Sequence, residues 1–378
     1  MNIPRKKVLS LFGTRPEVIK FAPILRHLER AGPHIQAINV VSAQHTDLLY
    51  PLNGFFKLRI DHDLHAMQSN QSPAAVGRRI VHRLLPLLEL EQPDIILVQG
   101  DTSTALAGSI AGAMRRIPVG HVEAGLRSGS LSAPFPEESY RRMITRLATY
   151  HFAPTCFNRD TLLREGVANE NIFLTGNPGI DSLLSVPRDS ARTPGLERIL
   201  AATQDYKRIV LTAHRRENFG PVMDEYFRTL RRFIEAHDDV ALIFPMHPNP
   251  AIAASADILR GHPRIHATGA LSYQDFVHLM RQSWLIVSDS GGVQEEAPSL
   301  GKPLLVLRGN TERPEAMMCG AARLAGESPE SLARALEETW RNRARMAWMR
   351  AVPNPFGRGD SGARIVESIQ SLLLAGRR

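Results

Sequence analysis

The sequence contains little cysteine and few aromatic residues. Its 378 residues include two cysteines, Cys156 and Cys319, and aromatic residues make up 6% of the chain. Two cysteines are too few for a disulfide framework, and these two lack the spacing of metal ligands. The low aromatic content leaves little material for the stacking surfaces that hold single-stranded nucleic acids. These scarcities exclude a disulfide-rich secreted domain, disfavour a nucleic-acid-binding protein and lead us to expect a cytoplasmic location.

Long hydrophobic runs are also missing. No apolar stretch approaches the roughly 20 residues that a membrane-spanning helix requires. The N-terminal segment MNIPRKKVLSLFGTRPE joins basic residues to a short apolar run but has no small-residue cleavage site. We therefore expect this run to be a first strand and not a signal peptide, and we expect no membrane association.

The sequence has more basic than acidic residues, 46 against 38. The formal net charge is +8, while 43% of the residues are hydrophobic and 22% are charged, as in an ordinary globular protein. A basic surface is typical of nucleic-acid-binding proteins, but the arginines here are scattered and have no aromatic residues between them. Solvated helix faces account for them better, and an anionic small substrate is compatible with this charge.

Short apolar runs alternate with longer helical patterns along the chain. This alternation predicts parallel sheets built from right-handed crossovers. Because a single hydrophobic core stops growing at roughly 250–300 residues, the length predicts two domains. The expected strands are Val8–Phe12, Ile35–Val41, Ile95–Val98, Val119–Val122, Ile172–Leu174, Arg208–Leu211, Ala241–Phe244, Arg264–His266, Leu285–Ser288 and Leu304–Leu307.

The domain boundary is expected in the segment Asp181–Gln204, which lacks a clear strand and carries several prolines and glycines. A final helix, expected at Gly362–Leu374, can pack back on the first half of the chain. We therefore predict one doubly wound domain of residues 1–177 with residues 360–378, and a second of residues 178–359. Ligands of such domains bind at the carboxyl ends of the strands. The chain has no Walker A motif and no G-x-G-x-x-G after the first strand, so a kinase or a dehydrogenase loses its main support.

The segment that begins at Asp289 predicts an anion site. An apolar run leads into Asp-Ser-Gly-Gly, and a short helix follows that turn. Backbone N–H groups and the helix dipole at such a turn suit a phosphate, which points to Ser290, Gly291 and Gly292. Glu295 and Glu296 lie one turn inside the helix and could receive sugar hydroxyls.

Two further turns carry cations. After the first expected strand, Thr14 and Glu17 form a capping box and Pro16 opens the helix, but this structural interpretation leaves Arg15 and Lys20 unexplained. We expect those two cations to contact a diphosphate. In the second half, His214 follows a strand and precedes two arginines, which favours a phosphate ligand or proton donor over a structural histidine. His247, in a proline-rich loop, is a weaker candidate of the same kind.

Three carboxylates follow expected strands or open a helix of the first half. Asp101 is either an N-cap or a carboxylate at the mouth of the site, and the sequence does not separate the two. Glu123 is costly to hold at the end of a central strand unless it is paired or used. Glu137 opens a helix beside Glu138, for which the helix dipole favours a structural role. Together Asp101, Glu123 and Glu137 could form a cluster in which repulsion raises the pKa of one member and makes an acid/base group.

Taken together, these motifs resemble one family. The segments FGTRPEVIKFAP, GDTSTA, GHVEAGLRSG, PEES, TAHRREN and DSGGVQEEAPSLGKPLLVLRGNTERPEA are similar to those of non-hydrolysing UDP-N-acetylglucosamine 2-epimerases, in the same order and over nearly the whole chain. The hydrolysing relatives have a different first turn, so the intact GTRPE favours the non-hydrolysing branch.

The resemblance implies a GT-B-type pair of Rossmann-like domains whose parallel sheets face a central cleft, in a homodimer without metal or nicotinamide. It implies interconversion of UDP-GlcNAc and UDP-ManNAc through loss of UDP, a 2-acetamidoglucal intermediate and re-addition of UDP. By this resemblance, the catalytic carboxylates are Asp101, Glu123 and Glu137, and His214 contacts the diphosphate and donates a proton. The resemblance implies that UDP is bound by Arg15, Lys20, Ser290, Gly291, Gly292 and Glu296. It also implies a second, activating UDP-GlcNAc site at Gln44 and His247.

The chain departs from the family pattern at Gln99, where histidine is common, and at Tyr140, where asparagine is common. Both departures leave the carboxylates intact but put the identity of the sugar in question, because epimerases for modified UDP-HexNAc sugars share this scaffold. A GT-B glycosyltransferase with the same UDP site is the alternative enzyme, and a UDP-sugar-binding regulator without turnover is the alternative outside catalysis.

Overall fold

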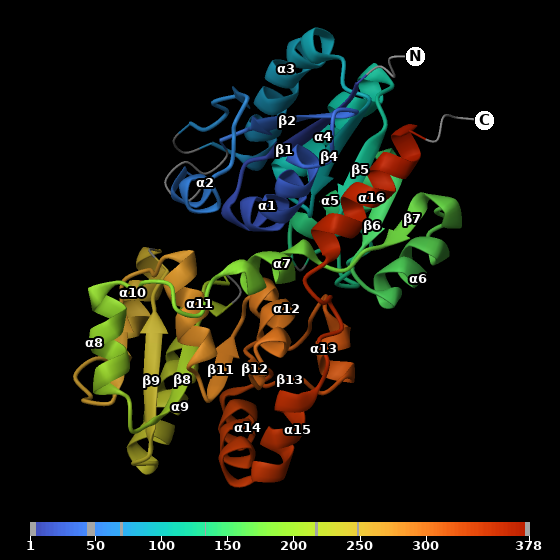
Figure 1. Ribbon diagram of the computed structural model, residues 1–378. Coiled ribbons are helices and arrows are strands. Elements are labelled where there is room, and N and C mark those ends of the chain that lie inside the picture. Colours follow the sequence, from blue (N-terminus) through green and yellow to red (C-terminus); the bar gives the residue numbers. More distant parts are fainter. Residues whose placement is uncertain are drawn as a thin grey trace. The chain divides into compact units, whose positions relative to one another are not determined.

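The computed structural model describes residues 5–43, 50–68, 71–132, 134–215, 218–247 and 249–374. The chain divides into two compact units (Figure 1). The first comprises Met1–Leu184 with Phe356–Arg378, and the second comprises Ser185–Pro355. The boundary that the sequence placed after residue 177 falls just before a helix whose residues belong almost entirely to the first unit.

The first unit is built on a seven-stranded parallel sheet of order β3-β2-β1-β4-β5-β6-β7. The strand order reverses between β1 and β4, which creates the switch point at which doubly wound sheets bind their ligands. The central strands read as almost continuous apolar runs because helices cover both faces of a parallel sheet. The strands are β1 (Lys6–Phe12), β2 (Ile35–Val41), β3 (His62–Asp63), β4 (Ile95–Gln99), β5 (Val119–Val122), β6 (Tyr150–Ala153) and β7 (Ile172–Leu174).

The helices of the first unit begin with clear signals. Thr14 and Glu17 form the expected capping box at α1, and Pro73 opens α3 behind the N-cap Ser72.

The C-terminal helix α16 packs against α1, where Gly362 lies so near Pro23 that a Cβ added to Gly362 would come within 3.0 Å of the Pro23 main chain. The helices are α1 (Arg15–Glu29), α2 (Tyr50–Phe56), α3 (Pro73–Glu91), α4 (Ser103–Arg115), α5 (Glu137–Leu147), α6 (Cys156–Arg164), α7 (Pro178–Ser185) and α16 (Ser361–Leu374), with a 3-10 turn η1 at Asn169–Asn171.

The second unit repeats this plan with a six-stranded parallel sheet of order β10-β9-β8-β11-β12-β13. Its switch point lies between β8 and β11, whose register pairs Thr212 with Ser288. The strands are β8 (Lys207–Thr212), β9 (Val240–Pro245), β10 (Ile265–Thr268), β11 (Leu285–Ser288), β12 (Leu304–Val306) and β13 (Ala322–Leu324). The helices are α8 (Pro194–Ala202), α9 (Pro221–Ala236), α10 (Pro250–Ala256), α11 (Tyr273–Arg281), α12 (Gly291–Ser299), α13 (Pro314–Met318), α14 (Pro329–Arg341) and α15 (Arg343–Ala351), with a 3-10 turn η3 at Asp257–Leu259.

This architecture confirms the expected pair of Rossmann-like α/β domains. Every expected strand is present, and the sequence missed β3, β6 and β13, which are short and lack an apolar run. The segment expected as a linker instead holds the end of α7 and all of α8. Within the part of the chain that the structure describes, no helix combines the length and apolarity needed to cross a membrane.

Candidate active site

In the first unit, the candidate catalytic residues lie at the carboxyl edge of the sheet. The β4–β5 register places Gln99 opposite Val122, so Asp101 and Glu123 follow two neighbouring strand ends. Glu123 has a φ of 66°, in the left-handed region that residues with a side chain rarely adopt. Such strain is typical of functional sites, where the surroundings hold a side chain in a chosen direction.

The Glu123 carboxylate is buried and bound by three donors from separate parts of the chain. Lys20 of α1 forms an ion pair with Oε1, and the Gln99 amide donates to Oε2. The Asn177 amide also donates to Oε1, at 3.3 Å. Lys20, which we expected to contact a diphosphate, therefore compensates the charge of a candidate catalytic carboxylate. Gln99, one of the two departures from the family pattern, is a hydrogen-bond donor to the same carboxylate.

Asp101 is held by an arginine that the sequence analysis did not single out. Arg141 of α5 places Nε 2.8 Å and Nη2 2.6 Å from Oδ2 of Asp101. The N-cap of α4 is Thr102, whose hydroxyl accepts from the backbone N–H of Ala105, so the interpretation of Asp101 as an N-cap is wrong. Asp101 is instead a partly exposed carboxylate with a fixed orientation.

The two neighbouring glutamates at the start of α5 have different surroundings. Glu138 is fully buried and accepts from the backbone N–H of Ser128 at 2.9 Å and from Arg141 and Arg142 at 3.2 Å each. These contacts fit its expected structural role. Glu137 is only half-buried, and within the described residues its Oε2 atom has no hydrogen-bond partner. Burial and hydrogen bonding therefore distinguish the two neighbouring glutamates.

Glu17 connects two of the turns at this edge. Its Oε2 accepts from the backbone N–H groups of Gly13 and Thr14 at 2.9 and 2.8 Å, and its Oε1 accepts from the Thr102 hydroxyl at 2.6 Å. Burial raises the pKa of Glu17 to about 7, against the opposing effect of these hydrogen bonds. Arg15 begins α1 beside this turn and is half-buried.

The second unit carries the expected anion site. Ser290 is the N-cap of α12, and its backbone N–H donates to the Ser288 hydroxyl at 3.0 Å. A Cβ added at Gly291 would lie 2.6 Å from Nη1 of Arg313, so a larger residue would require that guanidinium to shift. The helix thus begins with the two glycines that the sequence assigned to the phosphate turn.

The two glutamates of α12 differ, although the sequence treated them alike. Glu295 is buried and accepts from Nε of Arg313 at 2.5 Å, and Arg313 also pairs with Glu312 at 2.5 Å. Glu296 is half-buried. Glu295 therefore belongs to an internal ion-pair network, and Glu296 is the better candidate for a sugar or ribose contact.

The candidate histidines lie close together in this unit. His214 follows β8, its side chain is 40% exposed, and its Nδ1 atom lies 3.1 Å from Oδ1 of Asp289. The His247 ring stacks beside it with centroids 6.1 Å apart. Gln44, the other residue assigned to an activator site, lies outside the described residues.

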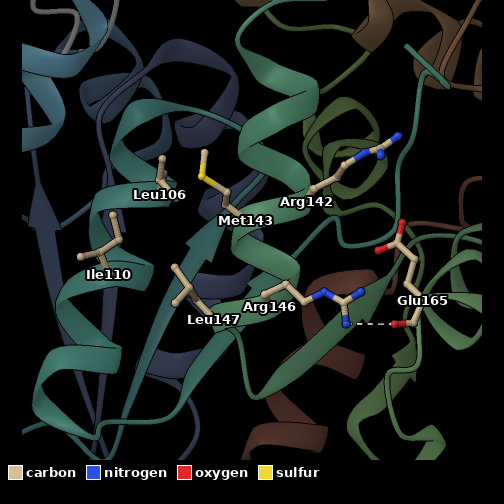
Figure 2. A pocket seen from close by; sticks show the side chains of 7 residues that line it. All are labelled: Leu106, Ile110, Arg142, Met143, Arg146, Leu147 and Glu165. Carbon is tan, nitrogen blue, oxygen red and sulfur yellow. Dashed lines mark hydrogen bonds between the residues drawn. The ribbon is translucent and has the colours of Figure 1, made fainter. Parts of the chain in front are cut away.

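A separate apolar groove lies on the first unit. One hollow of about 660 Å³ is lined by Leu106 and Ile110 of α4, by Met143 and Leu147 of α5, and by Arg142, Arg146 and Glu165 (Figure 2). A second hollow of about 580 Å³ shares Leu106 and Ile110 and extends to α3. Tyr140, the second departure from the family pattern, lines this second hollow, and neither hollow includes a candidate catalytic carboxylate.

These features first define a class. The molecule has two parallel doubly wound domains, one with a glycine turn at a helix start and one with carboxylates at its strand ends. This combination fits the class of nucleotide-sugar enzymes with a GT-B-type fold.

Comparison with known proteins then identifies the family. The family model for UDP-N-acetylglucosamine 2-epimerase matches residues 26–370. The UDP-N-acetylglucosamine 2-epimerase of Escherichia coli K12 is 42% identical over 371 residues, which cover 97% of this chain and 98% of that protein. The chain belongs to the UDP-N-acetylglucosamine 2-epimerase family, as its motifs predicted.

Solved structures agree with this assignment. A UDP-GlcNAc 2-epimerase from Neisseria meningitidis bound to UDP-GlcNAc has a TM-score of 0.91 and 37% identity, covering 97% of this chain and 100% of that one. The S. aureus MnaA structure with UDP has a TM-score of 0.91 and 38% identity, covering 98% of this chain and 97% of that one.

Proposed function

We propose that the protein catalyses the reversible C2 epimerisation of UDP-N-acetylglucosamine to UDP-N-acetylmannosamine. The observation that carries this proposal is the group of carboxylates at the carboxyl edge of the first sheet, in which Glu123 and Asp101 are each held by a cation. Relatives named for this activity support the choice of substrate. The expected cytoplasmic location stays a prediction.

The reaction that fits this site is an elimination followed by an addition. The C2 proton passes to a base, the C1–O bond to UDP breaks, and the C1–C2 double bond of a 2-acetamidoglucal forms. UDP then adds back to C1 while a proton reaches C2 from the opposite face. Two acid/base groups on different sides of the sugar ring can perform this sequence, and a fixed carboxylate typically contributes 10²–10⁴-fold to each proton transfer.

We assign the proton transfers to Asp101, Glu123 and Glu137. Glu137 is half-buried at the start of α5, beside the buried Glu138. Glu123 accepts from an ammonium group and two amides, which fixes its orientation.

We assign the UDP contacts to residues at the two switch points. In the second unit, Ser290, Gly291, Gly292 and His214 would bind the diphosphate, and Glu296 would accept from the ribose. In the first unit, Arg15 and Lys20 would add positive charge. The pairing of Lys20 with Glu123 indicates that its first role is to compensate that carboxylate. His247, beside His214, is proposed to contact a second, activating UDP-GlcNAc together with Gln44.

Incubation with UDP-GlcNAc in D2O tests the function. Mass spectrometry should show deuterium at C2 and a mixture of the two epimers. Transfer of the sugar to an added acceptor without C2 exchange would instead establish the glycosyltransferase alternative, and stabilisation by UDP-GlcNAc without exchange or transfer would establish the regulator. The same assay on UDP-HexNAc sugars modified at C3, C4 or C6 would identify the preferred sugar.

We also propose that the protein is a homodimer, as the resemblance implies, and that the apolar groove of α3, α4 and α5 is its contact surface. Met143, which lines the groove and is 43% exposed, should sit in the interface. The Met143→Glu variant should run as a monomer in light-scattering chromatography. Met318→Glu, at a 76% exposed methionine of the second unit, should stay a dimer. A monomeric wild type would refute the proposal.

A further inference from the structure

Asp289 is the first residue of the phosphate turn, yet neither the fold nor the family resemblance gave it a role. Its side chain is fully buried at the end of β11. A buried carboxylate is costly unless hydrogen bonds compensate it. Its oxygens accept from the backbone N–H of His214 at 3.0 and 3.1 Å, the backbone N–H of Arg215 at 3.0 Å and the Asn218 amide at 3.1 Å.

These contacts decide the charge of Asp289. Burial alone would raise the pKa of Asp289, but the hydrogen bond and charge of His214 and the backbone N–H groups hold the pKa below its ordinary value. Asp289 is therefore ionised at neutral pH. An ionised carboxylate has no proton to donate, so every group that faces it must be a donor.

The His214 ring is one of those groups. Its Nδ1 atom lies 3.1 Å from Oδ1 of Asp289, so Nδ1 must carry a proton. The other ring nitrogen, Nε2, does not contact Asp289. The His214 side chain is 40% exposed. The hydrogen bond made by one ring nitrogen sets the chemistry of the other.

We infer that Asp289 is a positioning residue that fixes the ring orientation and the Nδ1–H tautomer of His214, so that Nε2 meets the diphosphate. This inference rests on the proposed function for the identity of the ligand. When the ring is protonated, Nε2–H donates to a phosphate oxygen while the carboxylate stabilises the cation from the other side. In this arrangement the glycines of the turn bind the anion, and Asp289, its first residue, orients His214 toward the same anion.

A purely structural role is the alternative, because Asp289 also holds the backbone at residues 214 and 215. Asn218 offers a matched control. Its amide donates to the same carboxylate and to the Leu307 carbonyl, but not to the imidazole. The Asn218→Ala variant therefore weakens the support of the loop and leaves the Asp289–His214 contact in place.

The tautomer can be measured without any substitution of Asp289. In ¹⁵N-labelled full-length protein, two-dimensional NMR of the histidine rings should show several rings in the Nδ1–H form, among them His237, whose Nδ1 donates to the Phe233 carbonyl. One of these signals should disappear in His214→Asn. Asn218→Ala should keep this signal, and Asp289→Asn should lose it. An Nε2–H form for His214 in the wild type would overturn the inference even if Asp289→Asn failed to fold.

A double-substitution cycle tests the functional coupling. The dissociation constant of UDP should rise about tenfold in Asp289→Asn, in line with the loss of a charge-assisted hydrogen bond. The same substitution in a His214→Asn background should cost less than about twofold, because the group through which it acts is gone. Equal costs in both backgrounds would show that Asp289 only supports the loop. A wild type that shows this coupling but no C2 exchange would refute the proposed function and leave the positioning role intact.

Discussion

Replacing Glu17 with glutamine should change how the stability of the first unit depends on pH. Glu17 is fully buried between the turns that follow β1 and β4. Burial raises the pKa of Glu17 from 4.5 to about 7 in the folded protein. The glutamine side chain has nearly the same shape but does not titrate.

The sign follows from proton binding. Between pH 4.5 and about 7, the folded state binds more protons at Glu17 than the unfolded state does. The stability that this group contributes is therefore fully present below pH 4.5 and is lost as the pH rises to about 7. A shift of this size corresponds to about 1.4 kcal/mol per pH unit and roughly 3 kcal/mol in total. Relative to wild type, Glu17→Gln should thus gain roughly 3 kcal/mol of unfolding free energy across this window.

Hydrogen exchange can measure this difference in the first unit alone. Peptides from β1 and β4 would be followed by mass spectrometry at several pH values, with correction for the intrinsic exchange rates. The three tryptophans, Trp284, Trp340 and Trp348, all belong to the second unit, so their fluorescence checks that this unit is unchanged. Glu89→Gln, at an exposed glutamate, is the matched control.

Two outcomes would contradict this reasoning. A difference between variant and wild type that is constant with pH would mean that Glu17 titrates normally. A difference that favours the wild type as pH rises would mean that its three hydrogen bonds outweigh burial. The variant must be compared with wild type at each pH because the buried His121 and His151 have the opposite effect on how stability depends on pH. Burial lowers the pKa of each to about 4, so their stabilising effect is present above pH 6.5 and is lost as the pH falls towards 4.

Three further substitutions test the site. Asp101→Asn should lower the rate of C2 exchange about 100-fold in the deuterium assay, while calorimetry finds the affinity for UDP within about twofold of wild type; a near-normal rate would make this carboxylate structural. Arg141→Lys should lower kcat at least about tenfold with little change in KM, because lysine cannot make the two-point contact that fixes Asp101, whereas Arg142→Lys should behave as wild type. Gly291→Ala should lower the Tm of the second unit, measured by tryptophan fluorescence, because the added Cβ would collide with a buried guanidinium. Gly292→Ala should leave the Tm unchanged, because its Cβ has no neighbour closer than 4.0 Å. Equal Tm values for the two variants would show that the helix start tolerates the methyl group.

The sequence predicted the two sheets because parallel strands covered on both faces leave an apolar run wherever they pass through the core. The strand β6 illustrates the limit. It reads Tyr-His-Phe-Ala, and its first half pairs with β5 through residues that no hydrophobic pattern identifies. Strands of this kind are set by their neighbours in the sheet and not by their own residues.

The same distinction separates the site residues that could be predicted from those that could not. Asp101, Glu123 and His214 each lie within two residues of a strand end, so position along the chain was enough to select them. Their partners come from distant parts of the chain: Asn177 lies 54 residues from Glu123 in sequence, and Asp289 lies 75 residues from His214. Only the register of the sheets brings such pairs together.

The local pattern around Arg141 did contain a signal. Glu138 and Arg141 stand three positions apart on α5, the spacing of an ion pair on one helix face. That pair is internal to the helix, and the arginine reaches Asp101 with two of its remaining nitrogens. A buried arginine beside a buried glutamate at this spacing predicts a guanidinium with donors left over for a third group.

Two of the three candidate carboxylates of the first unit, Asp101 and Glu123, have the same kind of surroundings. Asp101 and Glu123 each sit at a strand end, and each is paired with a cation contributed by a helix from elsewhere in the chain. The cation compensates the cost of burying Glu123, and in both pairs the direction of the cation fixes the carboxylate. Glu137 differs, since its Oε2 atom lacks a hydrogen-bond partner among the described residues. Separate cations therefore orient Asp101 and Glu123 before substrate arrives, which supports the proposal that two acid/base groups act on the sugar ring.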